Sequence, residues 1–217
     1  MRIFRMEPAE GKVPVFLPGQ FAFIHLLDAE GNTIVKRPYS IASAPSAPYL
    51  EFCIEMRGGE MTGRLEKVNE GDVVGIDSPY GHMAYRGETR AAFICGGTGI
   101  APFMSVLRHA AEESLQGAFI LFYSVRSEDR ILYRDELEAL QKRNSGIKAV
   151  ITITREVPPG WKGECGRLSE AILKKHAGSP DGFDWFICGS PEMVKGVKEC
   201  LAALKVDLKR LRIEGWG

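Results

Sequence analysis

The first residues with a chemical signature are glycines that follow a short apolar run. Residues 91–95 are apolar, and Gly96-Gly97-Thr98-Gly99 follow them directly. Beyond them, apolar residues recur at spacings of three and four, which predicts a helix with Pro102 in its first turn. Such a corner points backbone N–H groups and the positive end of a helix at one place, where a phosphate can bind. Because the corner is neither G-x-G-x-x-G nor a P-loop, it indicates either a phosphate site or an ordinary turn.

A second corner of this kind begins at Cys188. The run Cys188-Gly189-Ser190-Pro191-Glu192-Met193 follows another apolar stretch, and Ser190 can cap the next helix with Pro191 in its first position. In a doubly wound sheet, ligands bind beyond the carboxyl ends of the strands, where the strand order reverses. Two open corners at that edge indicate a dinucleotide as the ligand.

The N-terminal part has chemistry of its own. Arg37-Pro38-Tyr39-Ser40 combine a cation, an aromatic ring and a hydroxyl. An arginine can bind a phosphate through two parallel hydrogen bonds, while the tyrosine can stack on a flat ring and the serine can hydrogen-bond it. The alternative is an ordinary strand with an exposed arginine and a buried tyrosine. Residues 59–63 start a short helix, and they either cap it or hold a phosphate oxygen.

The elements that would position these residues fall into two groups. Before residue 88, strands are expected at 20–27, 50–56 and 73–76, with one short helix on which Met61, Leu65 and Val68 share a face. The run 50–56 alternates, so that Leu50, Phe52, Ile54 and Met56 lie on one face. From residue 88, strands and helices alternate, which predicts a parallel sheet. The expected strands are 91–95, 118–123, 147–153, 183–188 and 211–214, and the expected helices are 100–115, 133–143, 168–176 and 191–204.

Composition limits the class of protein. The 217 residues carry 28 basic and 28 acidic side chains, so nothing favours nucleic acid or a membrane surface as a partner. No apolar run approaches the ~18 residues of a membrane span, and the first residues lack the apolar stretch of a signal peptide, so we expect a cytoplasmic protein. The five cysteines form no C-x-x-C pair, so we expect no metal site and no iron–sulfur cluster.

Taken together and in order, these motifs and Pro79-Tyr80-Gly81 resemble the ferredoxin–NADP reductase superfamily over nearly the whole chain. The resemblance implies an N-terminal antiparallel Greek-key β-barrel that binds flavin (residues 1–87) and a C-terminal Rossmann-like parallel-sheet domain that binds NAD(P) (residues 88–217). It implies an oxidoreductase that transfers hydride between NAD(P)H and bound FAD. FMN is the alternative flavin, because Met56 stands where relatives often carry a basic residue and Arg57 comes one position late.

The resemblance also assigns roles to individual residues. Arg37 would bind the flavin phosphates, Tyr39 would pack on the isoalloxazine ring, and Ser40 would hydrogen-bond the nitrogen that receives hydride. The other cofactor-binding positions that it implies are Pro38, Ile54, Glu55, Met56, Met61 and Thr62 for the flavin, and Gly97, Thr98, Gly99, Pro102, Gly189 and Met193 for the dinucleotide.

Three further residues would lie at the reacting centre. Cys188 would be a small, polarizable neighbour of the nicotinamide rather than a nucleophile, because no base is expected beside it. Plant-type members of the family resemble this chain in ending with a strand, a glutamate and an aromatic ring two residues later. By that match Glu214 lies beside the point of hydride transfer and Trp216 covers the flavin, and a frayed tail is the alternative.

The choice between NADP and NAD depends on the ends of two strands. Arg126 follows the second strand of the α/β domain, and Thr154-Arg155 follow the third. Arginine and hydroxyl groups suit the 2′-phosphate of NADP, whereas the free ribose of NAD favours a carboxylate. The sequence favours NADP, although three nearby carboxylates would repel a phosphate: Glu128, Asp129 and Glu156.

Three functions stay open at this point. The chain is an enzyme that passes electrons to ferredoxin, flavodoxin or free flavin, a flavoprotein subunit of a larger redox complex, or a nucleotide-binding module without catalysis. A partner subunit would bind at the edge of the barrel, which a short first strand leaves open.

Overall fold

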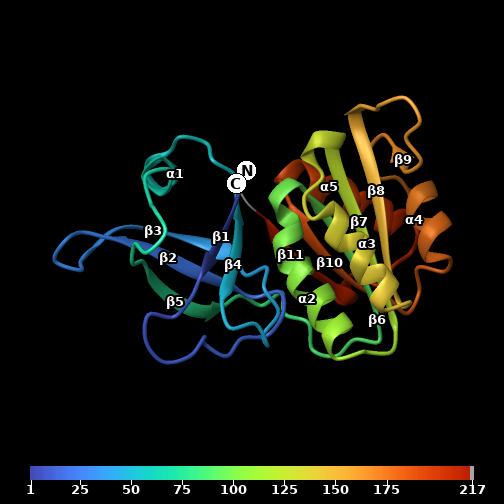
Figure 1. Ribbon diagram of the computed structural model, residues 1–217. Helices are drawn as coiled ribbons and strands as arrows, with labels where there is room; N and C mark the ends of the chain where they lie inside the picture. Colours follow the sequence, from blue (N-terminus) through green and yellow to red (C-terminus); the bar gives the residue numbers. More distant parts are fainter. Residues whose placement is uncertain (216–217) are drawn as a thin grey trace.

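A computed structural model describes residues 1–215, and it divides the chain into an N-terminal and a C-terminal half (Figure 1). The elements of the N-terminal half are, in chain order, β1 (Arg2–Met6), β2 (Phe21–Leu27), β3 (Thr33–Ser40), β4 (Leu50–Ile54), α1 (Glu60–Leu65) and β5 (Gly75–Tyr80). Those of the C-terminal half are β6 (Arg90–Gly96), η1 (Gly97–Ile100), α2 (Ala101–Glu112), β7 (Ala118–Ser127), η2 (Glu128–Arg130), α3 (Arg134–Arg143), β8 (Ile147–Glu156), β9 (Glu164–Cys165), α4 (Glu170–Ala177), β10 (Asp184–Gly189), α5 (Pro191–Ala203), η3 (Leu208–Arg210) and β11 (Leu211–Gly215).

The N-terminal half consists of antiparallel strands, as predicted. β3, β2 and β5 form one sheet in that order, β1 pairs with β4, and a bridge between Ile41 and Phe52 joins the two groups. Along β2, buried Ala22, Ile24 and Leu26 alternate with half-buried residues. This period of two places one face of the sheet on an apolar core.

The C-terminal half is the predicted parallel sheet. Within residues 1–215 its strand order is β11-β10-β6-β7-β8-β9, so the order reverses between β6 and β10. Alternate residues of the central strands feed two separate cores. One core includes residues of α2 and α3, and the other includes residues of α4 and α5. The helices therefore cover both faces of the sheet, which is the doubly wound arrangement.

The alternating residues Leu50, Phe52 and Ile54 of strand β4 lie in the N-terminal core, and the other face of the strand is buried as well. The strand ends at Ile54 rather than at residue 56, and all its residues are buried. Cys53 belongs to the core that contains α2, together with Ala42, Met83 and Tyr85. In Figure 1, α2 lies on the side of the parallel sheet that faces the N-terminal half. The second face of β4 is therefore covered by the other half of the chain and not by water.

Other differences lie at the ends of elements. β5 runs from Gly75 to Tyr80 rather than over 73–76, and α2 ends at Glu112 rather than at residue 115. The helix expected at 133 begins at Arg134, because Tyr133 has a left-handed backbone with φ of 56°. None of the helices in residues 1–215 has both the length and the hydropathy of a membrane span.

Two glycines give opposite expectations for alanine. A Cβ at Gly99 would lie 2.4 Å from the Cys188 carbonyl oxygen, whereas exposed Gly196 of α5 has open space around it. We expect Gly99→Ala to lower the free energy of unfolding by about 1–3 kcal/mol through overpacking, and Gly196→Ala to raise it by up to about 1 kcal/mol through helix propensity. Denaturant unfolding of both variants measures this. Equal effects would show that the corner at Gly99 can relax.

Candidate functional site

The two glycine corners meet where the strand order reverses. β6 ends at Gly96, β10 ends at Gly189, and the two strands are neighbours in the sheet. The Sδ atom of Met193 would lie 2.9 Å from a Cβ placed at either glycine, so this side chain packs against both corners. Ser190 caps α5 by accepting a hydrogen bond from the Met193 backbone N–H. The corners therefore border one position at the carboxyl edge of the sheet, where ligands of such sheets bind.

The first corner is a short 3₁₀ helix rather than an open turn. Gly97 has φ of +55° and a Cβ on it would meet nothing within 4 Å, so its backbone is open to a ligand. Thr98 is half-buried, and Gly99 packs against the Cys188 carbonyl. Pro102 lies in the first turn of α2, as predicted. This geometry suits the close approach of a phosphate to backbone N–H groups.

Cys188 and Glu214 lie side by side in the sheet. They are partners in the register of β10 and β11, and Cys188 also pairs with Cys95 of β6. The Oε2 atom of Glu214 is 3.7 Å from the position of a Cβ on Gly81, and a ring carbon of Phe21 is 3.0 Å from the same point. Gly81 and Phe21 belong to the N-terminal half, so Glu214 lies at the seam between the halves. Burial raises the pKa of this carboxyl to about 7.

Ser40 reaches the same region from β3. It is opposite Phe21 in the register of β2 and β3, and it is buried. Within residues 1–215 its hydroxyl has no hydrogen-bond partner. A buried hydroxyl without a protein partner costs free energy unless a ligand satisfies it. The Ser40 hydroxyl is therefore available to hydrogen-bond a ligand at this point. Tyr39 is half-buried next to Ser40 and Pro38 is exposed.

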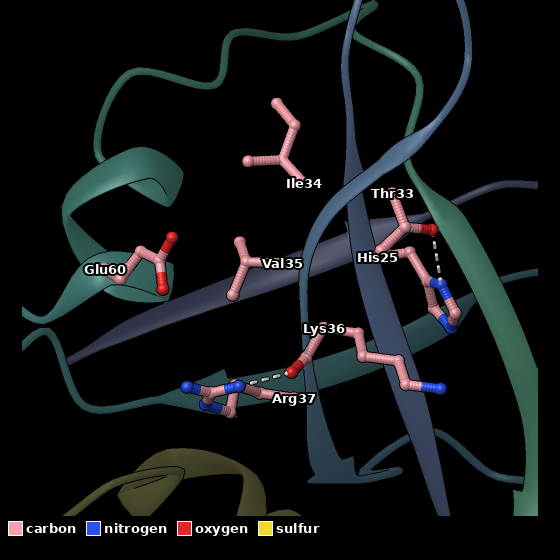
Figure 2. Close-up of a pocket in the computed structure, with 7 residues that line it drawn as sticks. All are labelled: His25, Thr33, Ile34, Val35, Lys36, Arg37 and Glu60. Carbon is pink, nitrogen blue, oxygen red and sulfur yellow. Dashed lines mark hydrogen bonds between the residues drawn. The ribbon is translucent and has the colours of Figure 1, made fainter.

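Arg37 lines a hollow along β3 (Figure 2). The hollow has a volume of about 360 Å³, and its lining residues are His25, Thr33, Ile34, Val35, Lys36, Arg37 and Glu60. Exposed Arg37 donates a hydrogen bond from Nη1 to the Lys36 carbonyl oxygen over 2.8 Å. Glu60 extends from α1 on the far side of Val35. Arg37 extends toward the same end of the hollow as Glu60, whereas the Lys36 ammonium extends the other way and lies 5.4 Å from the centroid of the Phe23 ring.

The other residues expected to bind flavin are spread along β4 and α1. Ile54 and Met61 are buried in the N-terminal core, so only their backbones are available to a ligand. Glu55 accepts two hydrogen bonds from Arg57, at 2.8 and 2.5 Å, and Met56 is half-buried. The Thr62 hydroxyl is 3.5 Å from the Gly59 carbonyl oxygen. Ser40, Cys188 and Glu214 therefore lie near the seam. The expected flavin-binding positions between residues 54 and 62 are instead distributed along the end of β4, α1 and the segment between them.

The residues expected to select NADP lie at the ends of β7 and β8. Arg126 and Arg155 are exposed, and the Thr154 hydroxyl donates a hydrogen bond to the Val125 carbonyl oxygen over 3.0 Å. Two of the carboxylates that would repel a phosphate already have partners. Glu128 pairs with Arg134, and Asp129 accepts a hydrogen bond from Ser127 over 2.5 Å.

Some expectations fall outside this geometry, and some residues were missed. Trp216 lies outside the described residues. From the sequence, Gly81 was named only as part of a motif, and Phe21 was not expected at the site. Arg108, which is buried in the middle of α2, was missed as well. The signal for Arg108 was an arginine inside the apolar run of a helix, since a buried charge needs a partner.

Two family models cover most of the chain. An oxidoreductase FAD-binding domain matches residues 1–85, and an oxidoreductase NAD-binding domain matches residues 93–199. Ferredoxin–NADP reductase B of Sorangium cellulosum is 31% identical over 99% of this chain and 91% of its own length. Sulfhydrogenase 2 subunit gamma of Pyrococcus furiosus is 35% identical over 65% of this chain and 48% of its own length. The chain spans about half the length of several other curated relatives.

The fold agrees with solved structures. A ferredoxin–NADP⁺ reductase from Neisseria gonorrhoeae, with FAD and NADP bound, superposes with a TM-score of 0.80 at 24% identity, over 98% of this chain and 91% of that one. The matched FAD-binding and NAD-binding domains and the similar reductase together establish the class of protein. The chain belongs to the ferredoxin–NADP reductase superfamily, and it is a flavoprotein oxidoreductase with an FAD-binding and an NAD(P)-binding part.

Proposed function

We propose that this chain transfers hydride between NAD(P)H and bound FAD and passes the electrons to a separate acceptor, such as ferredoxin, flavodoxin or free flavin. The observation that carries the proposal is the position of Glu214, which is the partner of Cys188 in the sheet and lies beside Gly81 and Phe21 of the N-terminal half. FAD supplies the redox chemistry when bound, and it would be held by residues 1–87, while residues 88–217 would hold the nucleotide.

The residues at the seam would align the two rings. Ser40 would hydrogen-bond the flavin through its buried hydroxyl, and Tyr39 would pack against the ring. Cys188, near the end of β10, would contact the nicotinamide. Its carbonyl oxygen packs against Gly99 of the glycine corner. Thr98 and its glycines would hold the pyrophosphate, and Met193, which packs against both corners, would border the nucleotide. Hydride transfer depends on contact distance and the exclusion of water, which a buried seam provides.

The direct test is the visible spectrum of the purified protein. We expect a yellow protein whose flavin absorbance bleaches when NADH or NADPH is added without oxygen. A colourless protein that still binds the nucleotide would instead support a nucleotide-binding module without catalysis.

A second function is supported by the edge of β1. Within the described residues β1 pairs only with β4, and Ile3 on it is 48% exposed. The similar sulfhydrogenase chain is named as a subunit, and an anthranilate dioxygenase relative is named as an electron transfer component. The chain would then act as the flavoprotein subunit of a larger redox complex. Weak activity alone and co-purification of a partner through β1 would favour this function.

The pH dependence of flavin reduction should report on Glu214. Its carboxyl is neutral below and negatively charged above a pKa of about 7. A negative charge beside a ring that gains an electron pair opposes the transfer. We therefore expect the wild-type reduction rate to fall up to about tenfold between about pH 6 and pH 8. The rate of Glu214→Gln should stay level over that range, because the amide cannot ionise.

Stopped-flow spectroscopy of the wild type and the variant at each pH measures this. Exposed Glu192→Gln is the control and should keep the wild-type profile. A Glu214→Gln profile that still falls through pH 7 would assign the ionisation to another group.

The preference for NADP should depend on Arg155. We expect Arg155→Ala to raise the KM for NADPH about tenfold, the loss of one charge-assisted hydrogen bond, and to leave the KM for NADH within about twofold. Arg143 lies before the other end of the same strand, so Arg143→Ala is the matched control and should change neither constant. Equal effects of Arg155→Ala on both nucleotides would count against this role.

A further inference from the structure

We propose that Arg108 is a positioning residue that sets the spacing between the flavin and the nicotinamide, because it ties the Ser40 segment to the helix that begins at the glycine corner. The proposal rests on the proposed hydride transfer. Nothing in the sequence motifs points to Arg108, and its role follows from contacts that cross the seam.

The guanidinium of Arg108 joins the two halves. Its Nη1 atom donates to the Ala42 carbonyl oxygen over 2.7 Å and to Oε1 of Glu51 over 2.8 Å, both in the N-terminal half. Its Nε and Nη2 atoms donate to the two carboxylate oxygens of Glu136 on α3, over 2.6 and 2.8 Å. The side chain is 10% exposed. In each of these hydrogen bonds the donor is the charged guanidinium, and such bonds have a closely defined geometry.

On the flavin side the bonds act on the segment that follows Ser40. Ala42 lies two residues beyond Ser40, and its N–H donates to the Glu51 carbonyl oxygen over 2.7 Å. The Glu51 N–H donates to the Ser43 hydroxyl over 3.1 Å. Arg108 therefore contacts two points of one hydrogen-bonded unit, which joins the segment immediately after β3 to β4. A shift of this unit against α2 moves Ser40 with it.

On the nucleotide side the connection is the helix itself. Arg108 lies seven residues after Ala101, which is about 10 Å along an α-helix. The glycine corner immediately precedes Ala101, and Gly99 packs against the Cys188 carbonyl. All residues of α2 from Ala101 to Arg108 are buried. The helix is therefore confined on all sides, and it connects the Arg108 contacts with the corner as a stiff element.

The face of α2 that meets the N-terminal half is built for close contact. Ala101 and Ser105 are small and lie on the same side of the helix as Arg108, and Glu112 at its end accepts a hydrogen bond from Ser46. The guanidinium carbon of Arg108 also lies over the ring of Tyr133, 5.2 Å from its centroid. A lysine in place of Arg108 could keep the charge, but it could not make the planar set of bonds to Ala42, Glu51 and Glu136.

Arg5 provides a matched control for a purely stabilising role. It donates from Nε to the other oxygen of Glu51, Oε2, over 2.9 Å. Arg5 and Glu51 lie in the same half, and the Arg5 side chain is 63% exposed. Arg5→Met therefore removes a bond to the same carboxylate without removing a link across the seam.

The test compares Arg108→Lys, Arg108→Gln and Arg5→Met as FAD-loaded proteins in anaerobic stopped-flow experiments with NADPH and NADH. For Arg108→Lys we expect full FAD occupancy, a nucleotide Kd within about threefold of wild type, and a limiting reduction rate about tenfold to a hundredfold lower. We also expect loss of the long-wavelength charge-transfer absorbance that reports stacked rings. Arg5→Met should reduce at a rate within about twofold of wild type.

Several outcomes would overturn the proposal. One is a wild-type rate for Arg108→Lys, and another is an equal loss of rate in Arg5→Met. A loss confined to nucleotide affinity would also contradict it. If neither Arg108 variant folds and retains FAD, Arg108 is a residue of stability and not of positioning. Failure of the wild type itself to be reduced contradicts the proposed function, and this inference with it, whereas a reduced wild type with unchanged Arg108 variants contradicts this inference alone.

Discussion

In the proposed hydride transfer two flat rings must lie in contact, and no single half of this chain would supply the residues for both. Ser40 comes from the antiparallel strands, and Cys188 and Glu214 come from the parallel sheet. The rest of the structure depends on this constraint. The glycine at position 99 allows the corner to pack on Cys188, and Gly81 allows the loop after β5 to approach Phe21 and Glu214. Both approaches need a residue without a side chain.

The seam contains charge as well as apolar packing. Glu51 is fully buried, and although burial alone would raise its pKa, Arg108 and Arg5 lower it. Buried ion pairs gain little net stability over apolar contacts, but removal of one partner costs about 3–5 kcal/mol. Their directional hydrogen bonds fix one arrangement of the two halves.

The fold and the edge of the sheet could be predicted because their signals are local. The period of the strands, the glycines after β6 and the Ser190-Pro191 cap each act within a few residues. Pairing between distant segments could not be predicted in this way. The apolar alternation of β4 predicted one shared apolar face, but it carried no sign that the face of Glu51 and Cys53 is covered by α2, which begins some fifty residues later. Arg108 was missed for the same reason, since its partners are 57 and 28 residues away in sequence.

This coverage of β4 has a consequence for synthesis at the ribosome. The N-terminal strands are made first, but the buried carboxylate of Glu51 gains its partner on α2 only after residue 108 has emerged, and Glu136 completes the set later still. Until then a nascent chain with folded strands exposes one face of β4 to solvent. Maturation of the first half therefore waits for translation of the second, and a ribosome stalled before α3 should hold a chain with an unprotected seam.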